Sequence, residues 1–81
     1  MTVEVLLFGP ERAAANADRV RVTLARDCSC AALRTGLALA VPPLAKSLAA
    51  ARFAVNSAFV PDSHEIKQGD EVALIGMVSG G

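Results

Sequence analysis

Only one segment of this 81-residue chain has the length and periodicity of a stable amphipathic helix. Between Ser29 and Ala40, apolar residues recur at spacings of three and four, which places them on one helical face. Ser29 suits the N-cap position, and Pro42-Pro43 ends the helix because proline lacks the N–H that a helix interior requires. Gly36 inside this segment predicts close packing on a neighbouring element. The rest of the chain therefore has to cover one main helix.

Extended segments are expected on both sides of this helix, because apolar and polar residues alternate there or form short apolar runs. The run from Glu71 to Ile75 is typical of a central strand with both faces covered. Glu11 to Ala17 is long enough for a turn or two of helix but not for a helix that is stable by itself, so we treat it as a connection. The predicted strands are Thr2–Phe8, Arg19–Leu24, Arg52–Asn56, Phe59–Val60 and Glu71–Ile75, with a second, shorter helix over Leu44–Ala51.

The order strand, strand, helix, strand, short strand, strand predicts an α+β fold. A mixed sheet of four to five strands would pack on the one main helix, with its first and last strands side by side at the centre. This is the β-grasp, or ubiquitin-like, arrangement. Residues 1–81 then form a single domain, of which residues 76–81 are expected to be a flexible C-terminal tail.

Charge and hydropathy argue against several kinds of partner. Eight basic and eight acidic side chains cancel and form no block, so nothing indicates binding of nucleic acid. No apolar run approaches the roughly 20 residues of a membrane-spanning helix, and the first residues lack the basic start of a secretory signal. The sequence therefore predicts a cytoplasmic protein that binds no membrane.

Side chains capable of catalysis are few. His64, the one histidine, lies in a polar turn with no serine or cysteine nearby in sequence, which favours a solvated loop residue. Cys28 and Cys30 are too close for an unstrained disulfide, and the chain lacks an evident set of four metal ligands. Free thiols, at least one of them in the core, are the favoured interpretation, and a redox role is the alternative. We expect this chain to bind no cofactor and no metal.

The glycine pair at the C-terminus is the remaining candidate. Gly80 and Gly81 have no side chains, so they could enter a narrow channel in another protein and leave the terminal carbonyl open to attack. If a partner joins the Gly81 carboxylate to AMP, a persulfide or a similar donor can replace the adenylate and leave a thiocarboxylate. A frayed chain end without function is the alternative, and the glycine pair alone does not decide between the two.

The tail and the segments that lead to it resemble a known family. Phe53-Ala-Val-Asn56, Gln68-Gly-Asp-Glu-Val-Ala73 and Val78-Ser-Gly-Gly81 are similar in residue type and spacing to the C-terminal half of the small subunit of molybdopterin synthase. Val5 to Gly9, followed by Glu11-Arg12, resembles the first strand and turn of that family. The family usually has two prolines where this chain has Gly76-Met77, which predicts a more flexible or differently angled exit of the tail.

The resemblance implies a sulfur carrier in molybdenum cofactor biosynthesis, a non-catalytic small subunit. In the implied cycle an E1-like adenylyltransferase uses ATP to adenylate Gly81, and a sulfurtransferase supplies the sulfur. The loaded tail then enters the large synthase subunit, which converts cyclic pyranopterin monophosphate to molybdopterin. ATP and zinc belong to the partners. The tail residues implied in this cycle are Met77, Val78, Ser79, Gly80 and Gly81.

Both partners would need a common docking surface. If the apolar residues from Val3 to Leu7 face the helix, Phe8 falls on the opposite face of the sheet. Phe59 and Ile75 correspond to positions where the family places apolar contacts to its partners. An exposed apolar patch of Phe8, Phe59 and Ile75 beside the tail is therefore expected, with ordinary core packing as the alternative.

Other functions remain open from the sequence. Sulfur carriers for thiamine-thiazole synthesis and for tRNA thiolation also end in Gly-Gly on this fold. The thiazole carriers tend to be shorter, with less chain between the helix and the third strand, so the segment Pro42 to Ala51 favours the molybdopterin branch. A ubiquitin-like modifier would instead be joined through Gly81 to lysines of other proteins. A passive β-grasp interaction domain would make no use of the glycines.

Overall fold

The computed structural model describes residues 1–76, and the predicted tail residues Met77 to Gly81 lie outside this range. All five predicted strands and the main helix are present, with ends that differ from the predicted ones by at most one residue. The elements are β1 (Thr2–Leu7), α1 (Gly9–Ala15), β2 (Arg19–Thr23), α2 (Cys30–Ala40), the 3₁₀ helix η1 (Pro42–Leu44), α3 (Ala45–Leu48), β3 (Arg52–Val55), β4 (Ala58–Val60) and β5 (Val72–Ile75).

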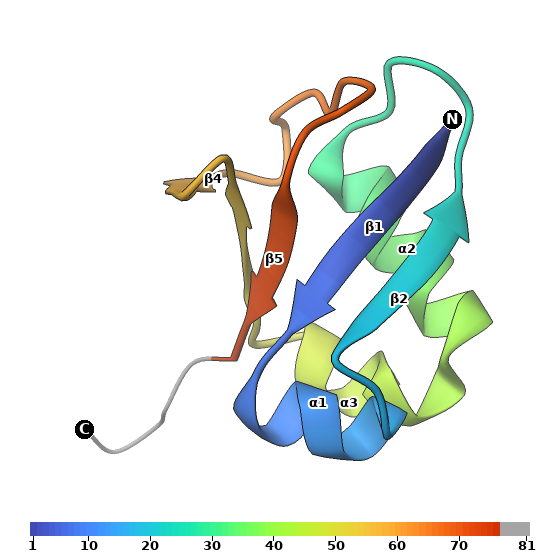
Figure 1. Ribbon diagram of the computed structural model, residues 1–81, viewed down its shortest axis with the longest axis vertical. Coiled ribbons are helices and arrows are strands. Elements are labelled where there is room, and N and C mark those ends of the chain that lie inside the picture. The colour runs from blue at the N-terminus through green and yellow to red at the C-terminus, as the bar shows by residue number, and fades with distance from the viewer. Residues whose placement is uncertain (77–81) are drawn as a thin grey trace.

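The strands form one mixed sheet in the order β2-β1-β5-β3-β4. β1 pairs in parallel with β5, and the other neighbours are antiparallel. The helix α2 lies across one face of the sheet, while α1 and α3 lie at the end where β1 and β5 finish (Figure 1). The first and last strands are thus side by side at the centre, and the predicted α+β, β-grasp fold is confirmed.

The core lies between this sheet and α2. Val3, Val5 and Leu7 alternate along β1 and are buried, as the pattern predicts. Gly36 lies where α2 approaches β2. A Cβ at this position would be 3.1 Å from Cγ1 of Val22, a distance shorter than normal packing allows. Close packing therefore explains the glycine inside the helix. The buried residues that complete the core include Val22, Cys30, Leu33, Leu37, Leu44, Leu48, Phe53, Val55, Ile66, Val72 and Leu74.

The segment treated as a connection is a helix, and that prediction is wrong. α1 spans seven residues, with Phe8 as its N-cap residue, Pro10 in its first turn and Asn16 in the left-handed conformation at its end (φ 54°). A helix of this length is marginal alone, but α1 packs against η1 and β5, and these tertiary contacts stabilise it.

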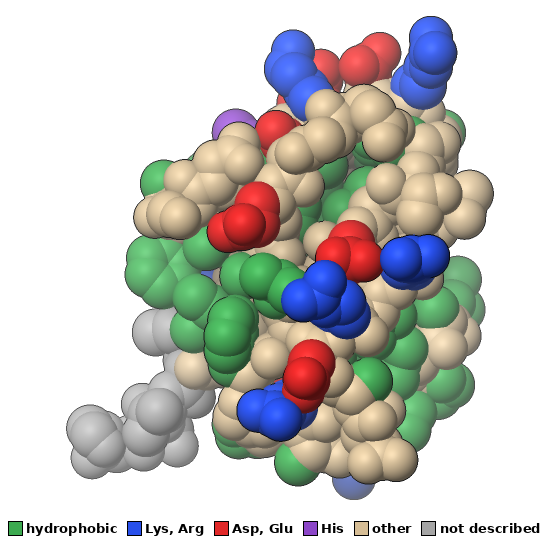
Figure 2. All heavy atoms as spheres, viewed as in Figure 1, with side chains coloured by type: hydrophobic (Ala, Val, Ile, Leu, Met, Phe, Trp, Pro, Cys, Tyr) green, Lys and Arg blue, Asp and Glu red, His purple; other side chains and the backbone are tan. Residues whose placement is uncertain are grey.

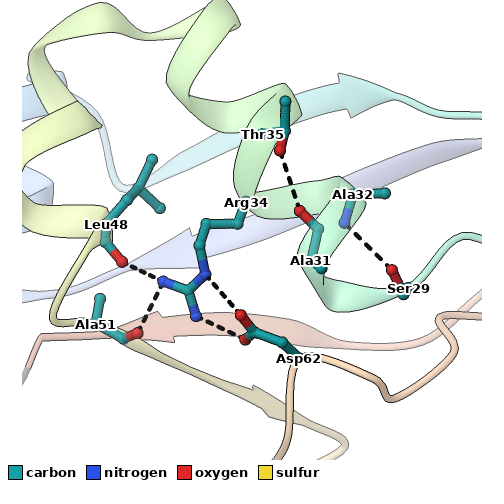
Figure 3. A network of polar contacts seen from close by, with 8 residues as sticks. All are labelled: Ser29, Ala31, Ala32, Arg34, Thr35, Leu48, Ala51 and Asp62. Carbon is teal, nitrogen blue, oxygen red and sulfur yellow. Dashed lines mark hydrogen bonds and ion pairs between the residues drawn. The ribbon is translucent and has the colours of Figure 1, made fainter.

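A network around Arg34 ties α2 to the segments on either side of β3 (Figure 3). Its Nη1 donates hydrogen bonds to the carbonyl oxygens of Leu48 and Ala51, the latter at 3.0 Å. Its Nε and Nη2 donate to the two carboxylate oxygens of Asp62, at 3.2 and 2.8 Å. The guanidinium carbon also lies 5.0 Å from the centroid of the Phe53 ring. One side chain therefore fastens α3, β3 and the loop after β4 to the main helix.

Replacing Arg34 with alanine is expected to lower the free energy of unfolding by about 2 kcal/mol, because two main-chain carbonyls and one carboxylate lose a charged donor. Urea denaturation measures this change. The control is Arg26→Ala, which removes an exposed arginine that makes no ion pair within residues 1–76 and is expected to change stability by less than about 0.5 kcal/mol. Equal effects of the two substitutions would contradict the account of the network.

Stability is expected to fall as the pH is lowered below about 4. The pKa of Asp62 is held below its ordinary 3.8, first by the hydrogen bond from Arg34 and then by its positive charge. The pKa of Asp70 is also lowered, first by the main-chain N–H of Lys67 and then by the Asn56 amide. The two carboxylates bind protons more tightly in the unfolded chain than in the folded protein. Their ionised forms therefore contribute fully to the free energy of unfolding above pH 3.8, and this contribution is lost as the pH falls through the lower pKa values of the folded state. Urea titrations from pH 7 downward should show a smaller acid loss in Asp62→Asn.

Candidate functional site

An apolar pocket lies on the sheet face away from α2, next to the end of β5. Strand register places Leu6, Ala73, Ala54 and Phe59 in one row across four neighbouring strands. The small side chains of Ala54 and Ala73 leave a hollow in the middle of this row. We call this hollow, ≈ 240 Å³ in volume, the β5 pocket; it is lined by Leu6, Phe8, Ala54, Ser57, Phe59, Glu71, Ala73 and Ile75.

The predicted patch residues Phe8, Phe59 and Ile75 all line the β5 pocket. Phe8 is 52% exposed and Phe59 is 53% exposed, so ordinary core packing does not describe these two rings. Ile75 is half-buried. Exposed large apolar side chains grouped in one place are typical of an interaction surface. The structure thus brings the three residues together, and their role in partner binding stays a prediction.

Charged side chains on this face lie mainly beside the pocket and pair with one another. Figure 2 shows one group of hydrophobic side chains at the left of this face and another along its right edge, with Lys, Arg, Asp and Glu side chains at the top and between the two groups. Glu4 pairs with Arg19 at 2.8 Å and with Arg21 at 3.3 Å, which joins β1 to β2. Arg52 lies over the Phe59 ring, 4.7 Å from its centroid. A pocket of ≈ 240 Å³ is smaller than the roughly 300–1,000 Å³ of small-molecule sites, so it suits a side chain of a protein partner better.

Cys30 and His64 are neighbours in space, although the sequence did not suggest a pair. The Cys30 N–H donates to the His64 carbonyl oxygen at 2.9 Å. The Cys30 thiol is fully buried, and that burial, followed by the nearby Asp62 charge, raises its pKa. A thiol that resists ionisation is a poor nucleophile, and the contact between Cys30 and His64 is made by the main chain, so neither observation supports catalysis by this pair. Cys28 is also free and donates to the Ala25 carbonyl at 2.9 Å.

No group of three or more His, Cys, Asp or Glu side chains that could hold a metal occurs within residues 1–76. Over the same range, no helix is long and apolar enough to cross a membrane.

The motifs that lead to the tail hold β5 in place. Asn56, in the turn after β3, adopts a left-handed conformation (φ 51°). Its side-chain amide donates to Oδ1 of Asp70 at 3.1 Å, and its side-chain oxygen accepts the Glu71 N–H at 3.0 Å. The main-chain N–H of Asn56 donates to the Glu71 carbonyl at 2.8 Å. These contacts join the β3–β4 turn to the start of β5, so the motif residues position the strand that precedes the tail.

A buried carboxylate lies where the chain leaves β5. Glu11, in α1, is 3% exposed and is the one buried charged residue in the described part of the chain. A Cβ added to Gly76 would lie 2.5 Å from its Oε2 and 2.7 Å from its Cδ. Sequence reasoning missed Glu11, because an acidic residue in a short alanine-rich segment carries no signal of burial. The only hint was the glycine at position 76, whose lack of a Cβ permits the contact.

The sequence matches the ThiS family over residues 5–81. Among curated proteins, none is similar enough to be matched. The fold is similar to SAMP1, small archaeal modifier protein 1, from Haloferax volcanii, with 25% identity over 100% of both chains and a TM-score of 0.86. A chain of the complex of subunits 1 and 2 of molybdopterin-converting factor from Helicobacter pylori 26695 is 27% identical over 100% of both chains, with a TM-score of 0.69. Caldiarchaeum subterraneum ubiquitin has the same fold, with 17% identity over 100% of this chain and 98% of its own and a TM-score of 0.66.

Proposed function

Because this chain belongs to the ThiS family, we propose that it is a sulfur carrier whose working group is the carboxylate of Gly81. Its fold is that of sulfur carriers related to ThiS and to molybdopterin-converting factor subunit 1, and also that of ubiquitin-like modifiers. The observation that carries the proposal is the extent of the family match, which runs to residue 81 and so includes the tail.

The proposed chemistry takes place at the C-terminus and inside partner enzymes. A carboxylate oxygen of Gly81 attacks the α-phosphorus of ATP in an E1-like adenylyltransferase, and pyrophosphate leaves. The terminal sulfur of a persulfide, supplied by a sulfurtransferase, then attacks the acyl carbon, and AMP leaves. The Gly81 acyl group is now joined to the sulfurtransferase through an S–S bond. A second thiolate attacks the sulfurtransferase sulfur of this bond and forms a disulfide with it, and the C(=O)S⁻ group leaves. The folded domain supplies no catalytic side chain in this scheme.

The β5 pocket is the proposed docking surface for both partners. It is apolar, it has the size of a protein side chain, and it is lined by Ile75, which lies two residues before the tail residue Met77. Two partners that use one surface bind in turn, so release of the activating enzyme precedes sulfur delivery. The proposed contact residues are Phe8, Phe59 and Ile75.

Molybdenum cofactor biosynthesis is the proposed pathway. Its support is the 27% identity, over the full length, with a chain of the complex between subunits 1 and 2 of molybdopterin-converting factor. By that similarity the loaded tail, Met77 to Gly81, enters a large synthase subunit, where its sulfur converts cyclic pyranopterin monophosphate to molybdopterin. The proposed location is the cytoplasm.

A ubiquitin-like modifier is the second candidate function. The 25% identity with SAMP1 over the full length of both chains favours it. In that function the adenylated Gly81 would be attacked by a lysine amine instead of a sulfur nucleophile, so both candidates share the first step.

Reconstitution separates these functions. The protein is incubated with the E1-like enzyme of the same cells, ATP and a persulfide donor, and then with the large synthase subunit and cyclic pyranopterin monophosphate. We expect a thiocarboxylate on Gly81 that is consumed as molybdopterin forms. If the thiocarboxylate is consumed only by a thiazole synthase or a tRNA thiolase, the protein is a sulfur carrier but the proposed molybdenum cofactor pathway is wrong. Lysine conjugates without a thiocarboxylate would establish the modifier.

A further inference from the structure

The buried carboxylate of Glu11 has no role in the sulfur chemistry described above. Its Oε2 has no hydrogen-bond donor within residues 1–76. Burying a carboxylate oxygen without a partner is unfavourable, because the oxygen loses its hydration without a compensating contact. A methionine or leucine would fill the same space without this penalty. Packing alone therefore gives no reason for a carboxylate at this position.

The carboxylate lies against the main chain of Gly76, the residue at which the chain leaves the sheet. The space that a Cβ of Gly76 would occupy is filled by Oε2 and Cδ of Glu11, at 2.5 and 2.7 Å from the Cβ position. Contacts of α1 with η1 and β5 hold Glu11 there. Gly76 comes directly after Ile75 of the β5 pocket and directly before Met77. Glu11 thus touches the chain between the docking surface and the tail.

We propose that Glu11 is a positioning residue for the tail, and that its carboxylate fixes the direction in which the main chain leaves β5 at Gly76. This positioning would bring Gly81 to the adenylation site while the E1-like enzyme is bound at the β5 pocket, so the role of Glu11 rests on the proposed function. The five residues after Gly76 span at most about 17 Å, so the direction in which the main chain leaves β5 limits the positions that Gly81 can reach. Placement of the reacting atoms matters for catalysis, where about 1 Å can cost 10²-fold.

Glu11→Met tests this directly, because it removes both carboxylate oxygens and keeps the side-chain volume. The matched control is Glu65→Met, the same change at an exposed position in the loop before β5. In ¹⁵N-labelled protein we expect the amide resonances after Gly76 to shift in Glu11→Met and to stay unchanged in the control. The melting temperature should not fall in Glu11→Met, since Glu11 makes no ion pair within residues 1–76.

With the E1-like enzyme, kcat for adenylation is expected to fall about tenfold or more in Glu11→Met, with KM unchanged because the β5 pocket is intact. Glu11→Gln, which keeps one acceptor oxygen and the shape, should lie between Glu11→Met and the unmodified protein. Gly76→Ala should lower both kcat and the melting temperature, because its Cβ displaces the carboxylate. The double variant Glu11→Ala/Gly76→Ala should regain the melting temperature but not kcat.

Two results would overturn the inference: tail resonances in Glu11→Met that match those of the unmodified protein, or an unchanged kcat with only the melting temperature altered. If the unmodified protein is not adenylated at all, the proposed function fails. The tail resonances then decide alone whether Glu11 directs the tail.

Discussion

Removal of Gly80 and Gly81 is expected to abolish thiocarboxylate formation and leave the folded domain intact. The reacting carboxylate would then belong to Ser79, two residues short of the position that the adenylation site accepts. A shift of this size removes the reacting atoms from attack geometry, so we expect a loss of at least about 10³-fold in sulfur loading. Incubation with the E1-like enzyme, ATP and persulfide, followed by mass spectrometry, measures it.

A variant with one serine added after Gly81 is the matched control. It keeps both glycines but moves the carboxylate by one residue, and we expect it to be as inactive as the truncated chain. Both variants should melt at the temperature of the unmodified protein, because β5, the last element within residues 1–76, ends at Ile75. Sulfur loading of the truncated chain at the normal rate would sink both the carrier and the modifier functions.

Phe59→Asp is expected to weaken binding of the E1-like enzyme and of the large synthase subunit together. The ring forms one wall of the β5 pocket, so the substitution removes an aromatic contact and places a carboxylate in an apolar interface. Central aromatic contacts are worth about 2–4 kcal/mol, which corresponds to roughly 30- to 1,000-fold in Kd. The ring is 53% exposed, so the fold should be little affected. Calorimetric titration with each partner measures Kd.

The control for this substitution is Leu39→Asp. Leu39 is 78% exposed and belongs to α2, which covers the face of the sheet opposite the β5 pocket. It adds the same charge to an equally apolar and more exposed position, and Kd for both partners should be unchanged. If Leu39→Asp weakened binding as much as Phe59→Asp does, the docking surface would be on the helix side of the molecule.

Local patterns were enough to predict most of the fold. The alternation in β1 predicts that Val3, Val5 and Leu7 are buried, because side chains in a strand point to opposite faces in turn. The same alternation sends Phe8 to the other face, where it lines the β5 pocket. Ser29 caps α2 through a hydrogen bond from the Ala32 N–H, as its residue type indicates.

What the sequence did not reveal depends on contacts between distant segments. α1 is a helix because η1 and β5 support it, and neither contact can be seen in its own residues. The burial of Glu11 follows from the same packing. Cys30 meets His64 because the loop before β5 returns to the start of α2, where Ser29 and Glu65 form an isolated bridge. The hydrophobic periodicity of a segment does not indicate which distant segments it contacts.

The structure also explains what the recurrent motifs do. Asn56 and Asp70 form a hydrogen bond with each other and hold the start of β5. The motifs that this chain shares with the resembling family therefore indicate the fold and the position of the strand that precedes the tail. These motifs do not indicate which molecule accepts the sulfur. The distinguishing feature of this chain is Gly76 with the carboxylate of Glu11 beside it, at the position where the resembling family usually has proline.

The most direct test of the central claim is intact mass spectrometry of the protein isolated from its own cells during active cofactor synthesis. We predict a fraction with a sulfur-for-oxygen mass increase that fragmentation localises to Gly81. A tail that carries only an unmodified carboxylate under those conditions, or one found only in isopeptide bonds to lysine, would contradict the proposed function.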